Sequence, residues 1–116
     1  MTLQRLHVGP RLSEAAIHHG VVYLAGQVPD QHPEASIEDQ TREVLGHIDR
    51  LLAEAGSDKT RLLSVQIFLA DIDEIGRMNA VWDRWVPPGH TPPRATVQAR
   101  LADARWRIEV VVTAAV

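Results

Sequence analysis

The sequence predicts an α+β fold in which a mixed β-sheet is backed by two helices. Segments with alternating or β-branched apolar residues occur at both ends of the chain and once between them. Two other segments repeat apolar residues every three or four positions, as amphipathic helices do. Because 116 residues, 45% of them hydrophobic, suffice for one core but not for two, we expect a single domain over residues 1–116.

The N-terminal part of the chain predicts three short strands. Residues 3–8 form the first, and residues 15–26 form two more around a turn at His19-Gly20. Two prolines and several acidic residues in the stretch 27–35 then predict a surface loop.

Two amphipathic segments predict the helices. The first begins at Ser36, whose hydroxyl can cap it, and ends at Gly56. The second lies within residues 71–86, where Asp71 or Asp73 can provide the cap. The apolar residues that share one face are Ile37, Val44, Leu45, Ile48, Leu51, Leu52 and Ala55 in the first helix and Ile75, Met78, Trp82 and Trp85 in the second.

The remaining strands lie between and after the helices. Residues 61–70 predict a central strand, and residues 94–101 and 106–116 predict two more, which gives the order β, β, β, α, β, α, β, β. The side chains expected on one side of the central strand are Leu63, Val65, Ile67 and Leu69.

The last strand predicts an oligomer. Two helices can cover only one face of such a sheet. Val110, Val111 and Val112 are consecutive, so both faces of this strand are apolar. We therefore expect the second face to pack against an identical chain, and we expect Val112 to lie in that interface.

The composition excludes several classes of chemistry. Without cysteine there is no disulfide, no thiolate nucleophile and no thiolate-bound zinc or iron–sulfur cluster. A net charge of -3, with Lys59 as the single lysine, provides no basic face for nucleic acid. No apolar run resembles a signal peptide or a membrane span, so we expect a cytoplasmic protein that does not bind membranes.

The histidines do not predict a metal site, and no cofactor is expected. No spacing places two of them on one helical face beside a carboxylate; they are His7, His18, His19, His32, His47 and His90. Asp71, Asp73 and Glu74 are interpreted as capping residues at a helix start. The glycines are scattered singly, so no phosphate-binding loop is predicted.

Arg94 and Glu109 are the polar residues that ordinary structure explains least easily. Arg94 follows two prolines at the start of a strand, and Glu109 lies inside the last strand between Ile108 and Val110. A buried carboxyl group without a partner tends to take up a proton, which is how general acids are made. The alternative is a structural ion pair of Glu109 with Arg94 or Arg100. The residues alone leave both interpretations open.

Several segments, in order along nearly the whole chain, carry a resemblance to one family. They are "GP" (9–10), "YLAGQVP" (23–29), "QTREVLGHIDRLLAEAGSDKTRLLSVQIFLAD" (40–71), "MNAVW" (78–82), "PPRATV" (92–97) and "IEV" (108–110). The chain resembles the Rid family, the YjgF-type reactive intermediate (imine/enamine) deaminases formerly named endoribonuclease L-PSP. Agreement of several segments in the same order makes the resemblance specific.

The resemblance implies a chorismate-mutase-like α+β domain that assembles as a homotrimer with its sites in clefts between neighbouring chains. Its deaminases use no metal or cofactor. They hydrolyse 2-imino and enamine acids to 2-oxo acids and ammonia. The partners that the resemblance implies are therefore a small carboxylate substrate and two further copies of the chain.

The resemblance also implies roles for individual residues. Arg94 matches the arginine that binds the substrate carboxylate, and Glu109 matches the glutamate that orients the attacking water. Gly26 matches a glycine whose backbone N–H approaches the substrate. Asn79 matches an asparagine near the pocket, and the backbone of Thr96 helps to define that pocket.

The sequence departs from the family pattern at two positions. Arg11 follows Gly9-Pro10 where an aromatic hydroxyl is usual, and Ala25 replaces the usual serine. Arg11 either binds a second acidic group of the substrate or pairs with Glu14. The resemblance thus predicts an imine deaminase of altered specificity. A non-catalytic trimer that binds small carboxylates or a regulatory partner is the alternative, and an endoribonuclease ranks last because no basic groove is predicted.

Overall fold

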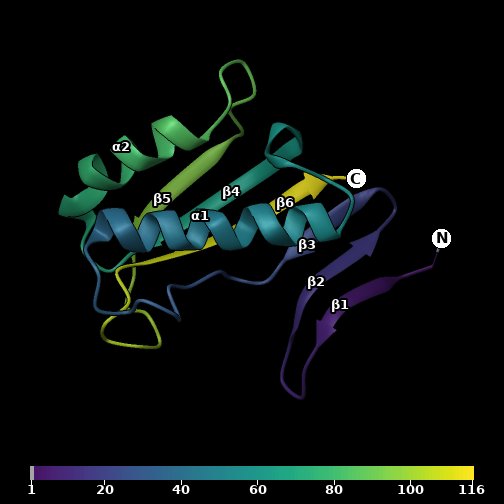
Figure 1. Ribbon diagram of the computed structural model, residues 1–116, viewed down its shortest axis with the longest axis horizontal. Coiled ribbons are helices and arrows are strands. Elements are labelled where there is room, and N and C mark those ends of the chain that lie inside the picture. The colour runs from purple at the N-terminus through teal and green to yellow at the C-terminus, as the bar shows by residue number, and fades with distance from the viewer. Residues whose placement is uncertain (1) are drawn as a thin grey trace.

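The computed structural model describes residues 2–116 and places one six-stranded sheet against two helices (Figure 1). The strands are β1 (Gln4–Val8), β2 (Ser13–His18), β3 (Val21–Leu24), β4 (Leu62–Leu69), β5 (Arg94–Gln98) and β6 (Ile108–Ala115). The helices are α1 (Ile37–Glu54) and α2 (Ile75–Trp85), and single 3-10 turns precede β4 and α2. The predicted α+β class and the predicted order of strands and helices are confirmed.

The last strand lies in the middle of the sheet. The strand order is β1-β2-β3-β6-β4-β5, and every pair is antiparallel except β4 with β5. The chain therefore returns after β5 through the loop of residues 99–107 and inserts β6 between β3 and β4. The strands that carry Arg94 and Glu109 lie on the two sides of β4.

Helix α1 begins and ends as the sequence predicts. The Ser36 hydroxyl accepts a hydrogen bond from the Asp39 backbone N–H at 3.2 Å, and Gly56 follows the helix with φ +83°. A positive φ is accessible to glycine at little cost, which explains why the helix ends there. All seven apolar residues predicted on one face of α1 are buried against the sheet.

The helix-side face of the sheet forms the core. In β6 the buried side chains are Ile108, Val110, Val112 and Ala114, which alternate with half-buried ones. Val112 is only 1% exposed, so its predicted place in an interface between chains is wrong. Because side chains alternate strictly along β6, Val112 points toward the helices and Val111 points toward the other face of the sheet.

A bulge changes the pattern at the start of β4. The pairing with β6 shifts between Leu62 and Ser64, so that Leu62 is buried and Leu63 is exposed. The prediction that Leu63 shares a side with Val65 was therefore wrong, because a bulge adds one residue to a strand and reverses the alternation before it. From Val65 onward the predicted side of the strand is buried as expected.

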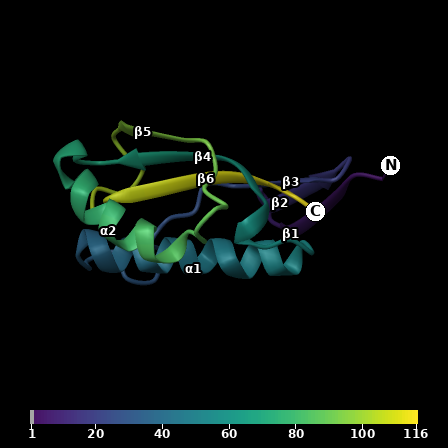
Figure 2. The ribbon, with the colours of Figure 1, turned by 90° about the horizontal axis from the view of Figure 1, so that it is seen from above.

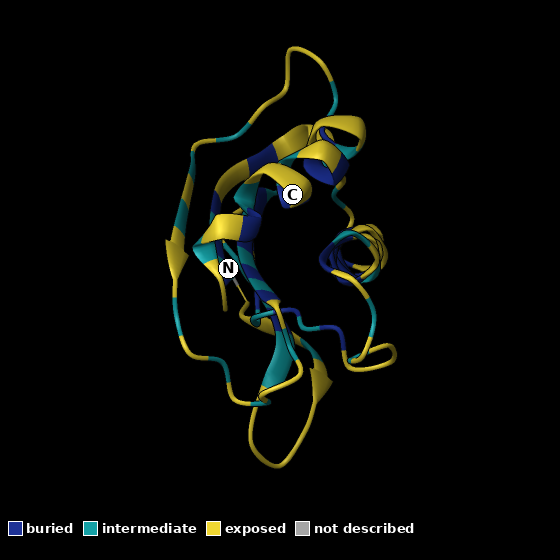
Figure 3. Ribbon diagram, turned by 90° about the vertical axis from the view of Figure 1, so that its left-hand side faces the viewer, coloured by how far each residue is buried: buried dark blue, intermediate teal, exposed yellow. Residues whose placement is uncertain are grey.

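The second face of the sheet, called the open face below, carries neither helix (Figure 2). Its apolar side chains include Tyr23 and Val97, which are 51% and 45% exposed, and the half-buried Phe68 and Val111. Figure 3 shows the exposed outer edge of the sheet on the side away from α1. Among the described residues, no helix is both long and apolar enough to cross a membrane.

Candidate functional site

The Glu109 carboxyl group lies directly over Gly26. A Cβ atom built on Gly26 would lie 2.0 Å from Oε2 of Glu109 and 2.9 Å from its Cδ. An isolated bridge between Gln27 and Val110 holds the chain after β3 against β6 at this point. Only a residue without a side chain allows Glu109 to take this position, so the structure brings together two of the residues predicted for the site.

Glu109 has no hydrogen-bond partner among the described residues. It projects from β6 onto the open face, where it pairs in register with Phe68, and it accepts no hydrogen bond from residues 2–116. Burial raises the pKa of this carboxyl group above its usual value, since desolvation disfavours the charged form. A partly dehydrated and unpaired carboxyl group of this kind is suited to exchange a proton with a bound water.

A free backbone donor lies beside this carboxyl group. Ala25 N–H donates to the Glu14 carbonyl at 2.9 Å, and Gln27 N–H donates to the Val110 carbonyl at 2.8 Å. Gly26 N–H, between them, has no acceptor anywhere in the described chain. An N–H group in this position can donate to a carboxylate or a carbonyl oxygen of a small ligand.

Arg94 lies on the helix side of the sheet. It pairs in register with the buried Val65 at the start of β5, and its Cζ atom lies 5.1 Å from the centre of the Trp82 ring. A guanidinium group over an indole is held by cation–π attraction. It makes no ion pair with any residue in the range 2–116. Trp82 was predicted as a core residue only, and its position three residues after Asn79 was the signal that could have placed it near the site.

Two buried polar atoms, one on β5 and one on α2, have no hydrogen-bond partner among the described residues. Thr96, two residues after Arg94 on β5, points to the same face, and its Oγ1 atom is buried without a hydrogen bond. Oδ1 of Asn79 in α2 is also buried without a partner. Buried polar groups in proteins are nearly always hydrogen-bonded, so these two atoms are free to bond to a water, a ligand or a second chain.

The predicted residues thus form two groups rather than one site. Glu109 and Gly26 lie together on the open face, whereas Arg94, Thr96 and Asn79 lie between β5 and α2. The alternative of a structural ion pair between Glu109 and Arg94 or Arg100 is wrong, because neither arginine pairs with Glu109 in the described structure.

Arg11 belongs to neither group. It is exposed in the turn between β1 and β2 and makes no side-chain hydrogen bond to any described residue. Its suggested partner Glu14 instead accepts from Nε2 of Gln27 at 2.8 Å. Gln27 is 5% exposed and also donates to the Ala25 carbonyl at 3.0 Å. This buried amide fixes the turn that carries Gly26, a role that the sequence did not reveal.

A cluster of possible metal ligands lies at the other end of the same loop. One ligand atom each from Asp30, Glu43 and His47 lies within 4.8 Å of the others. Sequence spacing did not reveal this cluster. Glu43 and His47 are one helical turn apart, but Asp30 is remote from both in the sequence. His47 is buried on α1, with 8% of its surface exposed.

Hydrogen bonds already use the atoms of this cluster. Nε2 of His47 lies 2.9 Å from Glu43 and 3.0 Å from Asp30, and Arg50 approaches Nδ1 at 3.3 Å. Arginine can only donate, so Nδ1 accepts and Nε2 carries the proton. A metal on Nε2 would require Nδ1 to donate instead, which Arg50 opposes. The arrangement therefore serves as a clamp between the loop and α1.

Comparison with known proteins agrees with this geometry. Residues 2–116 match the family model described as Endoribonuclease L-PSP. A "RutC family protein" of Haemophilus influenzae is 49% identical over 114 residues, which cover 98% of both chains. The chain belongs to the Rid family, also called YjgF or endoribonuclease L-PSP. The resemblance drawn from the sequence segments is confirmed.

Other Rid-family relatives share the whole length of the chain. The "RutC family protein YoaB" of Escherichia coli is 40% identical over 116 residues and covers 100% of both chains. A YjgF-family structure from Neisseria meningitidis has a TM-score of 0.95 at 44% identity, covering 99% of this chain and 95% of that one. An uncharacterized protein from Pseudomonas aeruginosa has a TM-score of 0.94 at 46% identity and 98% coverage of both chains. The Rid fold therefore extends over the full chain.

Proposed function

We propose that this Rid-family protein is a hydrolytic deaminase that converts reactive 2-imino and enamine acids to 2-oxo acids and ammonia. The observation that carries the proposal is the Glu109 carboxyl group, unpaired and partly dehydrated, held over the free N–H of Gly26. A carboxyl group that can accept a proton from water, next to a donor for a carbonyl or carboxylate oxygen, is what hydrolysis of a C=N bond requires.

We propose further that the site is completed by a neighbouring copy in a homotrimer. Arg94 suits a carboxylate because its planar guanidinium can donate two parallel hydrogen bonds. Within one chain, however, Arg94 faces α2 and Glu109 faces away from it. Packing the open face of one copy against the β5 edge of the next would cover the exposed Tyr23 and Val97 and would bring the two groups together.

The proposed reaction uses only groups of the protein and water. Arg94 of one chain binds the substrate carboxylate, and Asn79 and Thr96 line its side of the cleft. Glu109 of the next chain accepts a proton while the water oxygen bonds to C2 of the iminium acid. The proton then passes to the amine nitrogen, the C–N bond breaks as the C2 hydroxyl gives its own proton to Glu109 and becomes the carbonyl, and ammonia and the 2-oxo acid leave, after which Glu109 returns this proton to solvent. One imine and one water thus give one 2-oxo acid and one ammonia.

This proposal needs no metal, cofactor or nucleic acid. The cytoplasm is its expected location, because unstable imines form where amino acids are metabolised. The family description contains the word endoribonuclease, but a net charge of -3 does not favour binding to phosphate backbones. Cleavage of RNA is therefore the less supported function.

The test measures ammonia release from imines generated in place by an amino-acid oxidase and from the enamine released by a threonine dehydratase. The Arg94→Ala variant should lose at least about 100-fold in kcat/KM, as expected for loss of charge-assisted hydrogen bonds to a carboxylate. Arg84→Ala is the matched control, because Arg84 is exposed on α2 and forms no ion pair with any described residue.

Two outcomes decide between the proposal and its alternative. The deaminase proposal fails if the wild-type protein is no faster than Arg94→Ala across a panel of imino acids. In that case, thermal stabilisation by small carboxylates without turnover would support a non-catalytic binding protein.

A further inference from the structure

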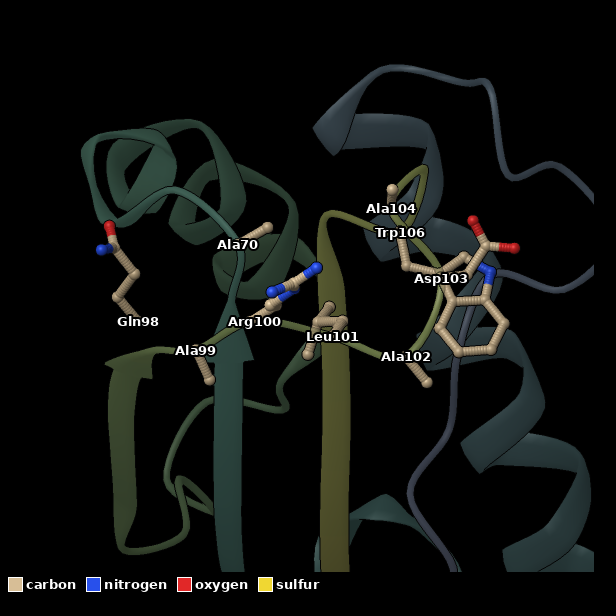
Figure 4. Close-up of a pocket in the computed structure, with 9 residues that line it drawn as sticks. All are labelled: Ala70, Gln98, Ala99, Arg100, Leu101, Ala102, Asp103, Ala104 and Trp106. Carbon is tan, nitrogen blue, oxygen red and sulfur yellow. The ribbon is translucent and has the colours of Figure 1, made fainter.

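A second charged residue shares the cavity of Glu109. On the open face, a cavity of about 250 Å³ lies where the loop of residues 99–107 meets the sheet. Its lining consists of Phe68, Ala99, Arg100, Leu101, Ala102 and Glu109, so Arg100 is the one cation in it. Four of these residues, Arg100 among them, also line a larger cavity of about 600 Å³ (Figure 4).

Arg100 has no anionic partner in the part of the chain that the structure describes. Two other arginines of the same loop already have acidic partners. Arg105 pairs with Asp103 at 2.8 Å, and Arg107 pairs with Glu74. No hydrogen bond or ion pair joins Arg100 to any of the residues that the structure describes. An unpaired guanidinium group on the wall of a cavity is a site for an anion.

The position of Arg100 is set by a well-bonded loop. Ala99 N–H donates to the Leu69 carbonyl at 2.9 Å, which continues the sheet one residue beyond β5. At the other end, Ala70 N–H donates to the Arg107 carbonyl at 3.0 Å. Between them Asp103 caps its own turn by accepting from Arg105 N–H at 2.8 Å. Arg100 therefore projects from backbone that is fixed on both sides.

Arg100 is also not the partner of Glu109. The pKa of the Glu109 carboxyl group is raised by desolvation, whereas an adjacent guanidinium would lower it. The cavity is thus lined by a carboxyl group free to act on water and by a cation free to bind an anion, with no ion pair between them among the described residues. Arg94 already supplies a cation for the first carboxylate of the proposed substrate.

We propose that Arg100 is a specificity-determining residue that binds a second carboxylate of the substrate, so that the preferred substrates are imino acids with two carboxylates. The proposal rests on the proposed function, whose site it shares. Such imino acids arise from oxidation of acidic amino acids. Both arginines are exposed, but Arg11 is a weaker candidate for the same role, because it lies in the turn between β1 and β2 and lines neither of the two cavities around Arg100.

The test compares a dicarboxylic with a monocarboxylic ligand in two measurements. Binding of 2-oxoglutarate and 2-oxobutyrate is measured by calorimetry, and hydrolysis of 2-iminoglutarate and 2-iminobutyrate is measured by ammonia release. The wild-type protein should prefer the dicarboxylic compound by about tenfold or more in both, which is the size expected for one charge-assisted contact. Arg100→Gln should abolish the preference, and Arg100→Lys should restore part of it.

Arg84→Gln serves as the control for loss of a surface charge and should keep the preference. Lack of a preference in the wild-type protein, or a preference that survives in Arg100→Gln, would overturn the role of Arg100 even if imines are hydrolysed. If no imine is hydrolysed at all, the proposed function fails, and the calorimetric preference still decides whether Arg100 selects a second carboxylate.

Discussion

Arg94 and Glu109 lie on opposite faces of the same sheet. Arg94 pairs with Val65 of β4, and Glu109 pairs with Phe68, three residues further along that strand. Residues an odd number of positions apart in a strand point to opposite faces, and the contact of Arg94 with Trp82 confirms its side. One chain alone therefore cannot place both side chains on one small substrate.

This relationship predicts complementation between two inactive variants. In a trimer with sites between chains, an Arg94→Ala chain still supplies Glu109, and a Glu109→Gln chain still supplies Arg94. Co-assembled at equal amounts, they should form intact sites at about a quarter of the interfaces, by random assortment of the two chains. The measurement is ammonia release from the mixture after joint refolding. Activity no higher than that of the separate variants would refute a shared site.

Gly26→Ala should abolish activity with little effect on stability. The new Cβ would displace the Glu109 carboxyl group, which can swing away because it is the end of a flexible side chain. Gly46→Ala is the matched control, since Gly46 lies in α1 with no atom near its Cβ position. It should keep full activity and gain about 0.5–1 kcal/mol from better helix propensity. A fully active Gly26→Ala protein would show that the close approach of Gly26 to Glu109 has no catalytic role.

The sequence predicted the secondary-structure elements and the site residues better than it predicted which face of the sheet each residue occupies. Helix boundaries at Ser36 and Gly56 follow from local capping chemistry, so they could be read directly. Leu63 could not be placed because a bulge depends on the pairing partner. Likewise, the side to which Val112 points depends on register across β6, and adjacency of three valines carries no information about that register.

Site residues from the family resemblance could be named but not positioned by sequence. Position 26 must be glycine because the Glu109 side chain of β6 lies against it. These two residues are more than eighty positions apart, so local sequence patterns do not indicate the contact. The sequence suggests Arg100 only as an ion-pair partner of Glu109. Its place in a cavity depends on how the loop after β5 folds, which the sequence does not show.

Glu109→Gln should make the protein more stable than wild type at neutral pH. The folded protein favours the neutral carboxyl group, and its pKa is raised above the ordinary value of 4.5. The wild-type protein is therefore at its most stable, relative to the variant, below pH 4.5, and it loses this stability as the pH rises through the raised pKa. Denaturant unfolding of both proteins at several pH values measures the difference. Equal midpoints at every pH would contradict a desolvated Glu109.

Glu43→Gln should loosen the loop after β3. Burial opposes ionisation of Glu43, but hydrogen bonds from the Gln31 and His32 backbone and from His47 lower its pKa overall. The resulting stability is present above the ordinary pKa of 4.5 and is lost as the pH falls through the lowered pKa. At pH 7 the variant should lose about 1–3 kcal/mol, the usual effect of removing hydrogen bonds to a charged group.

The control for this loop is Glu34→Gln, whose side chain is 80% exposed and should contribute almost nothing. Hydrogen exchange of the Gln31 and His32 amides, compared between the two variants, localises the change. Unaltered protection in Glu43→Gln would mean that the clamp does not hold the loop. Addition or chelation of divalent cations should leave the melting temperature of the wild-type protein unchanged, because Arg50 opposes a metal on His47.

Val111→Asp and Val112→Asp should have different effects although the two residues are adjacent. Val111 is half-buried on the open face, so a charge there should prevent assembly and leave a folded, inactive monomer. Val112 is 1% exposed under the helices, so a charge there should destabilise the fold itself by several kcal/mol, on the order of 3 or more. Sedimentation together with circular dichroism separates the two effects. An intact trimer in Val111→Asp would place the interface between chains elsewhere, and a folded monomer in Val112→Asp would contradict its place in the core.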